Sequence, residues 1–422
     1  MRAHARTHEA VGPSTLGGVG GRDTWDVAVV GGGPAGLAAA SAAAMAGART
    51  VIVERAEHPR YKTCGGGLMG ASLSAVADLD PLPARDQIHA ATFTLRGGRE
   101  YTRRYDRPIL AMVAREEFDD ALRRRAESAG AIVRQRAAAR GIGHDDDGNA
   151  SVRLADGSTV TARTVVGADG SAGITARHVG VAFSQVDLGL EQEIEVPAAV
   201  AAEWRGRVLL DWGKRPGSYG WVFPKGDRLT VGVIAARGQG DSRRQADSRR
   251  QGDSRRQGEW TKEYLREFVA RLRLDSFKAV QDSGHLTRCR TDDSPLRKGR
   301  VLVTGDAAGL LEPWTREGIS FALRSGAFAG EAAAKAAVAD SPDAAAEALD
   351  EYAAAVNRVL VPEMRAGRMF LAAFSKHPGV FHAGLASPKG QRLFGRLCRS
   401  EITYPEIAAK SPVRRALALL SH

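Results

Sequence analysis

Three glycines and one carboxylate near the N-terminus have the types and spacing that dinucleotide binding needs. Gly31, Gly33 and Gly36 follow a short apolar run at 27–30, and Glu54 ends the next apolar run 18 residues after Gly36. Glycines at this spacing let the backbone turn tightly and approach a pyrophosphate at a helix N-terminus, while the carboxylate accepts ribose hydroxyls. The pattern predicts a strand–helix–strand unit that binds a dinucleotide. An ordinary structural turn is the alternative.

Two aspartates follow later apolar runs at turns of the same kind. Asp169 ends Val-Val-Gly-Ala-Asp and precedes Gly-Ser, and Asp306 ends Val-Leu-Val-Thr-Gly-Asp. A carboxylate at such a turn can bind a ribityl or ribose hydroxyl, or a pyrophosphate through water. Because NAD-dependent dehydrogenases also carry a single glycine fingerprint, these residues alone leave the choice of dinucleotide open.

A cysteine and three aromatic residues are the further candidates for chemistry. Cys64 precedes three glycines. A thiol of ordinary pKa, about 8.5, is protonated at neutral pH and could donate a proton, and a small inert side chain is the other interpretation. Tyr219, Trp221 and Phe223 alternate along a predicted strand and should share one face, either as the wall of an apolar cavity or as ordinary core.

Length and composition describe the protein that must position these groups. A chain of 422 residues, 43% hydrophobic and 26% charged, can fold into two to three domains. Its three cysteines lack metal-ligand spacing, so we expect a reducing compartment and no metal site. The first 24 residues are polar and Gly-rich, which predicts a disordered tail without a secretory signal. The uncharged run 27–48 contains Gly31-Gly32-Gly33-Pro34 and predicts no membrane span.

The net charge of +11 is concentrated in two segments, residues 355–422 with +8 and residues 239–256 with +3. The second segment repeats Gln-Gly/Ala-Asp-Ser-Arg-Arg three times and predicts a solvated loop, with an anion-binding arm as the alternative. In the first segment Arg392, Arg396 and Arg399 have helical spacing, which suits either a membrane-surface contact or a solvated face. We expect no nucleic-acid partner, because the basic residues lack interleaved aromatics and no reader module is present.

The glycine fingerprint and the two aspartate turns together resemble the FAD-binding pattern of the p-hydroxybenzoate hydroxylase-like flavoproteins. Three further stretches resemble the geranylgeranyl reductase family within that superfamily: Lys62-Thr-Cys-Gly-Gly-Gly-Leu68, Tyr219-Gly-Trp-Val-Phe-Pro-Lys225 and Pro313-Trp-Thr-Arg-Glu-Gly-Ile319. Arg316 stands where that family usually has glycine. The Arg-Arg repeat is an addition, and the C-terminal region matches no motif of the family.

The resemblance implies FAD as the cofactor and assigns roles to individual residues. A helix beginning near Gly318 would aim its N–H groups at the flavin edge where charge accumulates on reduction. Catalysis is assigned to Cys64, Tyr219 and Trp221, and substrate binding to Tyr219, Trp221 and Phe223. The cofactor-binding residues would be Gly31, Gly33, Ala35, Gly36, Glu54, Cys64, Gly65, Gly67, Arg115, Ala139, Asp169, Asp306, Gly318 and Ile319.

The predicted fold is α/β, with a Rossmann-type FAD-binding domain, an inserted antiparallel β-sheet substrate domain and a helical C-terminal region. The FAD-binding domain would comprise residues 25–75, 105–180 and 285–345. Residues 76–104 and 181–284 would form the substrate domain, with a low-complexity insertion at 239–257, and residues 346–422 a basic helical region.

The function implied by the resemblance is an FAD-dependent reductase that saturates C=C bonds of a geranylgeranyl or polyprenyl chain on a diphosphate, lipid or quinone. Its electron donor would be NADPH or a ferredoxin, and its location the cytoplasm, either free or peripheral at a membrane. Two alternatives stay open: an FAD-dependent monooxygenase that acts on a lipophilic metabolite, and a non-catalytic prenyl-binding protein that has lost its flavin.

Overall fold

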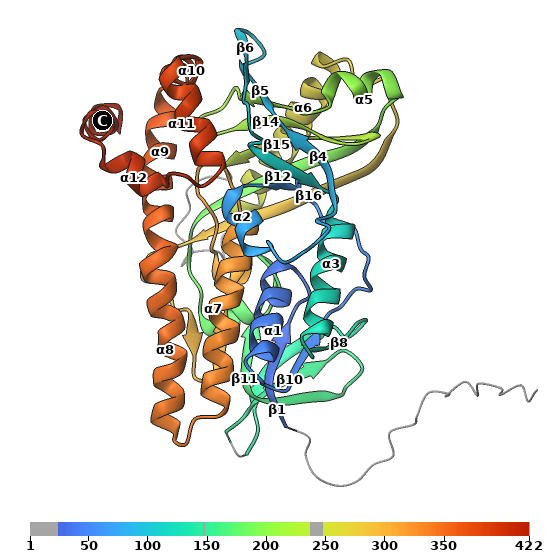
Figure 1. Ribbon diagram of the computed structural model, residues 1–422, viewed down its shortest axis with the longest axis vertical. Helices are drawn as coiled ribbons and strands as arrows, with labels where there is room; N and C mark the ends of the chain where they lie inside the picture. The colour runs from blue at the N-terminus through green and yellow to red at the C-terminus, as the bar shows by residue number, and fades with distance from the viewer. Residues whose placement is uncertain (1–23, 147, 237–247, 422) are drawn as a thin grey trace, which may run out of the picture.

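A computed structural model describes residues 24–146, 148–236 and 248–421. The largest sheet has eight strands. Six of them lie side by side in the order β17–β18–β11–β1–β2–β8, and β10 pairs with β11 and with β9 (Figure 1). The five strands from β18 to β8 run parallel. Buried Val, Leu and Ile residues in β18, β11, β1 and β2 are typical of strands covered on both faces, whereas the edge strand β8 is more exposed. The bounds are β1 Trp25–Val30, β2 Thr50–Val53, β8 Ile132–Arg134, β9 Ala139–His144, β10 Ala150–Leu154, β11 Thr159–Gly167, β17 Arg297–Lys298 and β18 Val301–Val303.

Two small-residue helices pack closely against each other on this sheet, α1 (Pro34–Met45) and α7 (Ile319–Ala337). A Cβ added at Gly326 would lie 2.2 Å from the carbonyl oxygen of Ala35, and one at Gly330 would lie 2.1 Å from that of Ala39. Because only glycine permits this approach, the Ala- and Gly-rich sequences bring the two helix axes together. Helix α3 (Arg115–Ser128) lies beside α1, and α4 (Thr175–Val179) follows β11.

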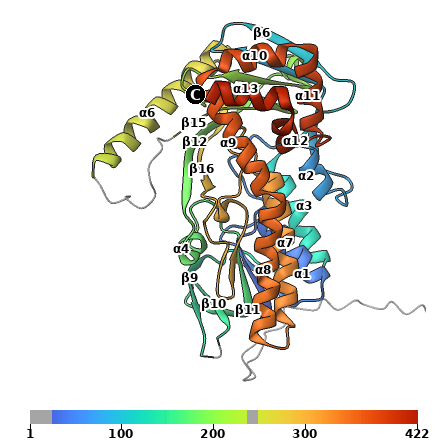
Figure 2. The ribbon, with the colours of Figure 1, turned by 90° about the vertical axis from the view of Figure 1, so that its left-hand side faces the viewer.

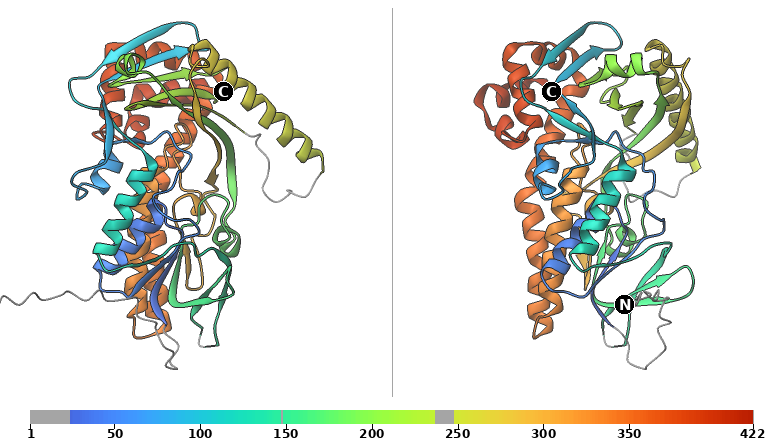
Figure 3. Two further views of the ribbon diagram at one scale, coloured as in Figure 1. Left: turned by 90° about the vertical axis from the view of Figure 1, so that its right-hand side faces the viewer. Right: turned by 45° about the vertical axis from the view of Figure 1, so that its right-hand side comes forward.

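The second sheet has seven strands in the order β16–β12–β15–β14–β13–β5–β6 and is antiparallel except between β13 and β5. One face packs against α6 (Ser248–Arg271), where Tyr264, Leu265 and Phe268 are buried. Figure 3 shows α6 projecting obliquely from this sheet. The bounds are β5 Ala90–Leu95, β6 Glu100–Arg104, β12 Phe183–Glu195, β13 Arg207–Trp212, β14 Tyr219–Lys225, β15 Arg228–Ala236 and β16 Ala279–Arg290, with α5 at Ala198–Trp204.

A short three-stranded sheet, β3–β7–β4, lies between these two sheets, and a helical region completes the chain. Helix α8 lies beside α7, and the helices from α9 to α13 gather against the seven-stranded sheet (Figures 1 and 2). The bounds are β3 Gly67–Leu68, β4 Ala84–Ile88, β7 Leu110–Val113, α2 Gly70–Ala75, α8 Pro342–Val359, α9 Val361–Lys376, α10 Pro378–Ala386, α11 Pro388–Cys398, α12 Tyr404–Ala409 and α13 Ser411–Ser421.

The predicted fold class is confirmed, and one local prediction needs correction. Residues 248–256 of the Arg-Arg repeat belong to α6 and not to a loop, because this helix begins at Ser248. Residues 239–247 of the repeat, and residues 1–23 of the predicted tail 1–24, lie outside the described residues. The proposed domain boundaries stay a prediction, and β16 continues past residue 284 to Arg290.

Candidate active site

One cavity of about 1490 Å³ runs from the glycine turn after β1, past the aromatic face of β14, to the C-terminal helices. All the predicted site residues line it except Gly36. Residues far apart in the sequence therefore meet in one space: Tyr219 and Ile319 are 188 and 288 positions from Gly31.

Gly36 supports the glycine turn from behind and does not face the cavity. A Cβ on Gly36 would lie 1.9 Å from the carbonyl oxygen of Gly31, and one on Gly31, where φ is +106°, would lie 2.4 Å from that of Ala168. The Glu54 carboxylate accepts hydrogen bonds from the backbone N–H of Gly32 at 2.5 Å and of Ala56 at 2.9 Å. Gly31, Gly33, Gly36 and Glu54 thus form a tight turn, here called the glycine cradle, whose backbone is open to the cavity.

Two helix N-termini point into the cavity beside this cradle. Pro34 and Ala35 begin α1, and Gly318 and Ile319 begin α7; the last three of these four were among the predicted cofactor contacts, and all four line the cavity. The partial positive charge of a helix N-terminus favours an anionic group, such as a diphosphate or a reduced flavin edge. At Gly318 φ is −122°, which any residue can adopt. Glycine suits this position because the backbone packs closely on Leu311: a Cβ on Gly318 would lie 2.9 Å from Leu311 Cδ1.

Asp306 presents a charged carboxylate to the same space, with 32% of its side chain exposed. His285 Nε2 lies 3.3 Å from its Oδ2, and Lys62 Nζ lies 3.3 Å from the other ring nitrogen of His285. Burial would raise the pKa of Asp306, but the His285 hydrogen bond and the positive charges of Lys62 and Arg115 outweigh it and lower the pKa. Asp306 is therefore ionised at neutral pH and available to a hydroxyl donor.

Asp169, Arg115 and Ala139 line the cavity, but the first two have partners within the protein. Asp169 Oδ2 accepts the backbone N–H groups of Ile174 and Thr175 at 2.6 and 3.0 Å, so its carboxylate holds the turn that leads into α4. The Arg115 guanidinium makes a bidentate pair with Asp119 at 2.8 and 2.9 Å, and Cys64 is near enough to affect its pKa electrostatically. Arg115 thus places a buried positive charge between the glycine cradle and Cys64.

The loop that carries Cys64 is held by buried side chains at both the N–H and the carbonyl of that residue. Glu191 Oε1 accepts the Cys64 N–H at 2.6 Å and the Tyr61 hydroxyl at 2.9 Å. Lys225 Nζ donates to the Cys64 carbonyl at 3.3 Å and to Glu193 at 3.0 Å. Glu191, Glu193 and Lys225 were not predicted. The sequence signal for the two glutamates is alternation, because every second residue of β12 from Asp187 to Glu193 is buried.

The glycines after Cys64 pack closely against neighbouring protein groups. A Cβ on Gly65 would lie 2.7 Å from the Phe223 ring, and one on Gly66, where φ is +75°, would lie 2.2 Å from the Val113 carbonyl oxygen. Gly65 and Gly67 still line the cavity. The small residues let this loop lie flat on the aromatic strand, so that the Cys64 thiol reaches the cavity.

Tyr219, Trp221 and Phe223 share one face of β14 and line the middle of the cavity. Neighbouring ring centroids are 5.9 and 6.4 Å apart. The Tyr219 hydroxyl donates to the Thr315 carbonyl, and burial raises the pKa of Tyr219 well above its ordinary value. Because this proton is already shared with a backbone carbonyl, Cys64 is better placed than Tyr219 to supply a proton. Trp221 Nε1 is buried without a partner among the described residues.

Arg316, the departure noted in the sequence, forms a buried ion pair. Its Nε lies 3.0 Å from Asp187 Oδ2, and the two side chains are 3% and 1% exposed. Its backbone has φ +58°, a region that glycine adopts more easily, and its guanidinium carbon lies 5.8 Å from the Tyr219 ring centre. The ion pair therefore ties the segment before α7 to β12, directly beside the aromatic face.

Helices α10 to α13 line the far half of the cavity, a role that was not predicted from the sequence. Phe381, Leu393, Phe394 and Leu397 of α10 and α11 line it, together with Tyr404, Ile407, Val413, Leu417 and Leu420 of the last two helices. The apolar side of α11 thus faces the cavity. Of the three predicted surface arginines, Arg396 and Arg399 lie 3.9 and 2.9 Å from Glu401. In the described chain, no helix combines the length and apolar character needed to cross a bilayer.

Comparison with known proteins agrees with this arrangement. Residues 24–361 match the FAD binding domain family. The menaquinone reductase of Mycobacterium tuberculosis (strain ATCC 25618 / H37Rv) is 31% identical over 328 residues, which cover 73% of this chain and 76% of that protein. The chain belongs to the geranylgeranyl reductase family of FAD-dependent oxidoreductases.

Two further relatives of the flavoprotein come from a plant and an archaeon. The chloroplastic geranylgeranyl diphosphate reductase of Oryza sativa subsp. japonica is 30% identical over 333 residues, covering 72% of this chain and 65% of that protein. A geranylgeranyl bacteriochlorophyll reductase-like structure from Thermoplasma acidophilum has a TM-score of 0.69 at 22% identity, covering 95% of this chain and all of that one. The latter shows the shared fold.

The residues present fit FAD. The glycine cradle has no room for a Cβ at Gly31 or Gly36, two helix N-termini face the same space, and the Asp306 carboxylate is open to it. The flavoprotein would hold the diphosphate at the cradle and α1, and the flavin between Cys64 and the N-terminus of α7. The non-catalytic alternative, which required loss of flavin, is wrong for this family of oxidoreductases.

Exchange of Gly36 for alanine tests the cradle. The added Cβ would overlap the Gly31 carbonyl oxygen at 1.9 Å, so the turn must shift and FAD affinity should fall about tenfold or more. Flavin absorbance per mole of purified protein measures the loss. Gly258→Ala is the matched control, since a Cβ at that position in α6 meets no atom within 4 Å. Equal flavin content in both variants would contradict the assignment.

Substitution of Glu191 tests how the Cys64 loop is held. Glu191→Leu removes the acceptor of the Cys64 N–H and the Tyr61 hydroxyl, so the loop should open and Cys64 should react with a thiol reagent about tenfold faster. Glu191→Gln keeps an acceptor oxygen and should react at nearly the native rate. If both variants react like the native protein, Glu191 does not hold the loop.

The same two proteins, native and Glu191→Gln, should differ in the pH dependence of stability. Burial, followed by the negative charge of Glu193, raises the pKa of Glu191 above its ordinary value. The native protein therefore holds this proton more tightly than the unfolded chain, and the stability it contributes is lost as the pH rises through the raised pKa. Urea unfolding at a series of pH values should give a flatter profile for Glu191→Gln. Parallel profiles would show that Glu191 titrates normally.

Proposed function

We propose that this flavoprotein is a reductase that saturates C=C bonds of a geranylgeranyl or other polyprenyl chain. The observation that carries the proposal is the cavity of about 1490 Å³, which joins the FAD cradle to an apolar space walled by the C-terminal helices. A linear prenyl chain needs such a long apolar space, and the relatives reported above are named geranylgeranyl diphosphate reductase and menaquinone reductase. The electron donor, NADPH or a ferredoxin, is part of the proposal.

Bound FAD, once reduced, would supply a hydride to one olefinic carbon. The second carbon needs a proton, and we assign it to the thiol of Cys64, with water as the competing source. The buried guanidinium of Arg115 lies near this thiol and would compensate the negative charge that proton transfer leaves on sulfur. Glu191 and Lys225 hold the Cys64 peptide, so the thiol keeps its direction toward the cavity.

The remaining residues would position the chain and exclude water. An isolated alkene has no carbonyl to polarise, so the rate depends on the orientation of the double bond and on a dry site. Tyr219, Trp221 and Phe223 form the wall next to Cys64, and Trp314 with Phe370 and Phe381 continues it toward the helices. The helical region 346–422 is therefore proposed as the seat of the distal prenyl units.

Mass spectrometry of the product tests the proposal. The purified enzyme is incubated with dithionite and geranylgeranyl diphosphate, geranylgeranyl lipid or prenylated quinone, with and without oxygen. A gain of two hydrogens per reduced bond in the absence of oxygen supports the reductase. A product that contains an added oxygen atom and forms only in air supports the monooxygenase instead.

A further inference from the structure

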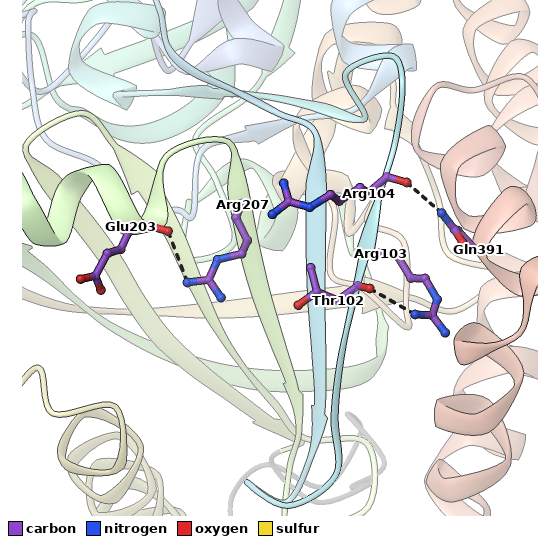
Figure 4. A pocket seen from close by; sticks show the side chains of 6 residues that line it. All are labelled: Thr102, Arg103, Arg104, Glu203, Arg207 and Gln391. Carbon is purple, nitrogen blue, oxygen red and sulfur yellow. Dashed lines mark hydrogen bonds between the residues drawn. The ribbon is translucent and has the colours of Figure 1, made fainter.

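A second hollow of about 600 Å³ lies at the outer edge of the seven-stranded sheet, apart from the lining of the main cavity. It is formed by β6, the edge strand, together with the start of β13, the end of α5 and the start of α11 (Figure 4). Three of its residues carry guanidinium groups. The lining residues are Thr102, Arg103, Arg104, Glu203, Arg207 and Gln391.

The strand register places two of these arginines on either side of one alanine. Arg207 is paired with Ala90 across β13 and β5, and Ala90 is paired with Arg104 across β5 and β6. Residues in one such row point to the same face of a sheet, so both guanidinium groups rise over the small Ala90 side chain. Figure 4 shows the Arg104 side chain extending toward Arg207 above this part of the sheet.

Hydroxyl groups lie in the next row on the same face. Thr92 is paired with Thr102, and their hydroxyl oxygens are 2.9 Å apart. Arg207 Nη1 lies 3.5 Å from Thr92 Oγ1. Thr102 lines the hollow beside the two arginines, whereas Ala90 and Thr92 are buried beneath it, with 2% and 0% of their surface exposed.

The arginines are oriented by neutral groups, so their charges are not cancelled. Arg207 stacks on the Trp204 ring at 4.5 Å and donates to the Glu203 carbonyl at 3.4 Å. Arg103 lies 4.9 Å over the Tyr101 ring and donates to the carbonyl oxygens of Thr102 and Ala386. Within the described parts of the chain, no carboxylate lies within 4.0 Å of these guanidinium groups, and that of Arg104 has no partner there. Like charges in one row repel, so an anion between them would stabilise the arrangement.

The hollow adjoins the helical end of the main cavity. Leu385 and Gly390 line the main cavity, whereas their neighbours Ala386 and Gln391 contact the arginine strand: Ala386 accepts from Arg103, and Gln391 Nε2 donates to the Arg104 carbonyl at 2.8 Å. An amphiphile whose chain lies among α10 and α11 would therefore have its polar end near the arginines.

We propose that Arg104 and Arg207, with Arg103 at the rim, form a binding site for a phosphoryl group. Guanidinium groups bind phosphate oxygens by paired, charge-assisted hydrogen bonds, and the hydroxyl of Thr102 in the lining adds a neutral donor. The identity of the natural ligand, the phosphate or diphosphate of a prenyl compound, rests on the proposed function. The proposal that the site binds a phosphoryl anion is independent of that function.

Titration calorimetry with inorganic diphosphate tests the site on the FAD-loaded protein. Arg104→Gln and Arg104→Gln/Arg207→Gln should bind about tenfold or more weakly than the native protein. The control, Arg153→Gln/Arg177→Gln, removes two exposed arginines from β10 and α4 and should bind like the native protein. Arg104→Gln removes an exposed side chain and should fold normally. No binding to the native protein, or equal losses in the control, would overturn the proposal.

Sedimentation with vesicles identifies the source of the phosphoryl group. Arginine-dependent binding to vesicles that contain phosphatidic acid, without binding of free diphosphate, would assign the site to a lipid headgroup. Binding of free diphosphate with no preference for such vesicles would assign it to a soluble substrate. Neither measurement requires turnover, so a failed reductase assay with intact diphosphate binding would refute the proposed function and leave this site standing.

Discussion

The Cys64→Ala variant is expected to reduce polyprenyl substrate about 10²-fold more slowly than the native enzyme while it retains its FAD. The thiol is the polar hydrogen donor that the fixed loop turns into the cavity between Arg115 and the aromatic face. Removing it leaves only water to protonate the second carbon, in a cavity built to exclude water. Because substrate is held by other residues, kcat should fall with little change in KM.

Two further variants make this result specific. Cys64→Ser keeps a proton donor on the same loop and should recover part of the rate. Cys289→Ala removes a fully buried thiol in β16 and should leave kcat unchanged. A native rate in Cys64→Ala, measured by single turnover of the reduced enzyme, would show that the proton comes from elsewhere.

The Arg316→Leu variant is expected to lose about 3–5 kcal/mol of unfolding free energy. It leaves Asp187, which is fully buried, without its ionic partner. Gln185 Nε2 alone would still donate to that carboxylate, at 2.6 Å. Denaturant unfolding of the FAD-loaded protein measures the loss.

The double variant Arg316→Gly/Asp187→Asn is the matched control. It removes both charges together and restores glycine where φ is +58°, so it should recover most of the lost stability. The interaction energy follows from the cycle of Asp187→Asn, Arg316→Gly and the double variant. Additive effects would mean that the ion pair contributes nothing to stability.

The sequence predicted the dinucleotide end of the site well, because that end depends on local rules. Gly31, Gly33 and Gly36 sit between a strand and a helix, and Glu54 follows the next strand, so one βαβ unit fixes their geometry. Gly318 likewise marks the start of α7. The geometry of these features is determined by the residues directly before and after each motif.

The parts that were missed depend on contacts between distant segments. In the sequence, Glu191 is one of several charged residues in a polar stretch. Its side chain reaches Cys64 because β12 pairs between β15 and β16, and this pairing joins distant segments. The packing of Gly65 against Phe223, 158 positions away, likewise depends on how distant segments meet. The wall formed by α10 to α13 follows from how helices dock on the sheet, which amphipathic spacing alone cannot specify.

The roles proposed for the site residues depend on direct electron transfer from bound flavin to a prenyl chain. The measurement that tests this most directly is anaerobic absorbance spectroscopy of the reduced enzyme after addition of geranylgeranyl substrate. We predict that oxidised flavin absorbance returns in proportion to substrate bonds reduced, with one flavin reoxidised per two hydrogens gained. Flavin that stays reduced with every prenyl substrate until oxygen is admitted would contradict the account.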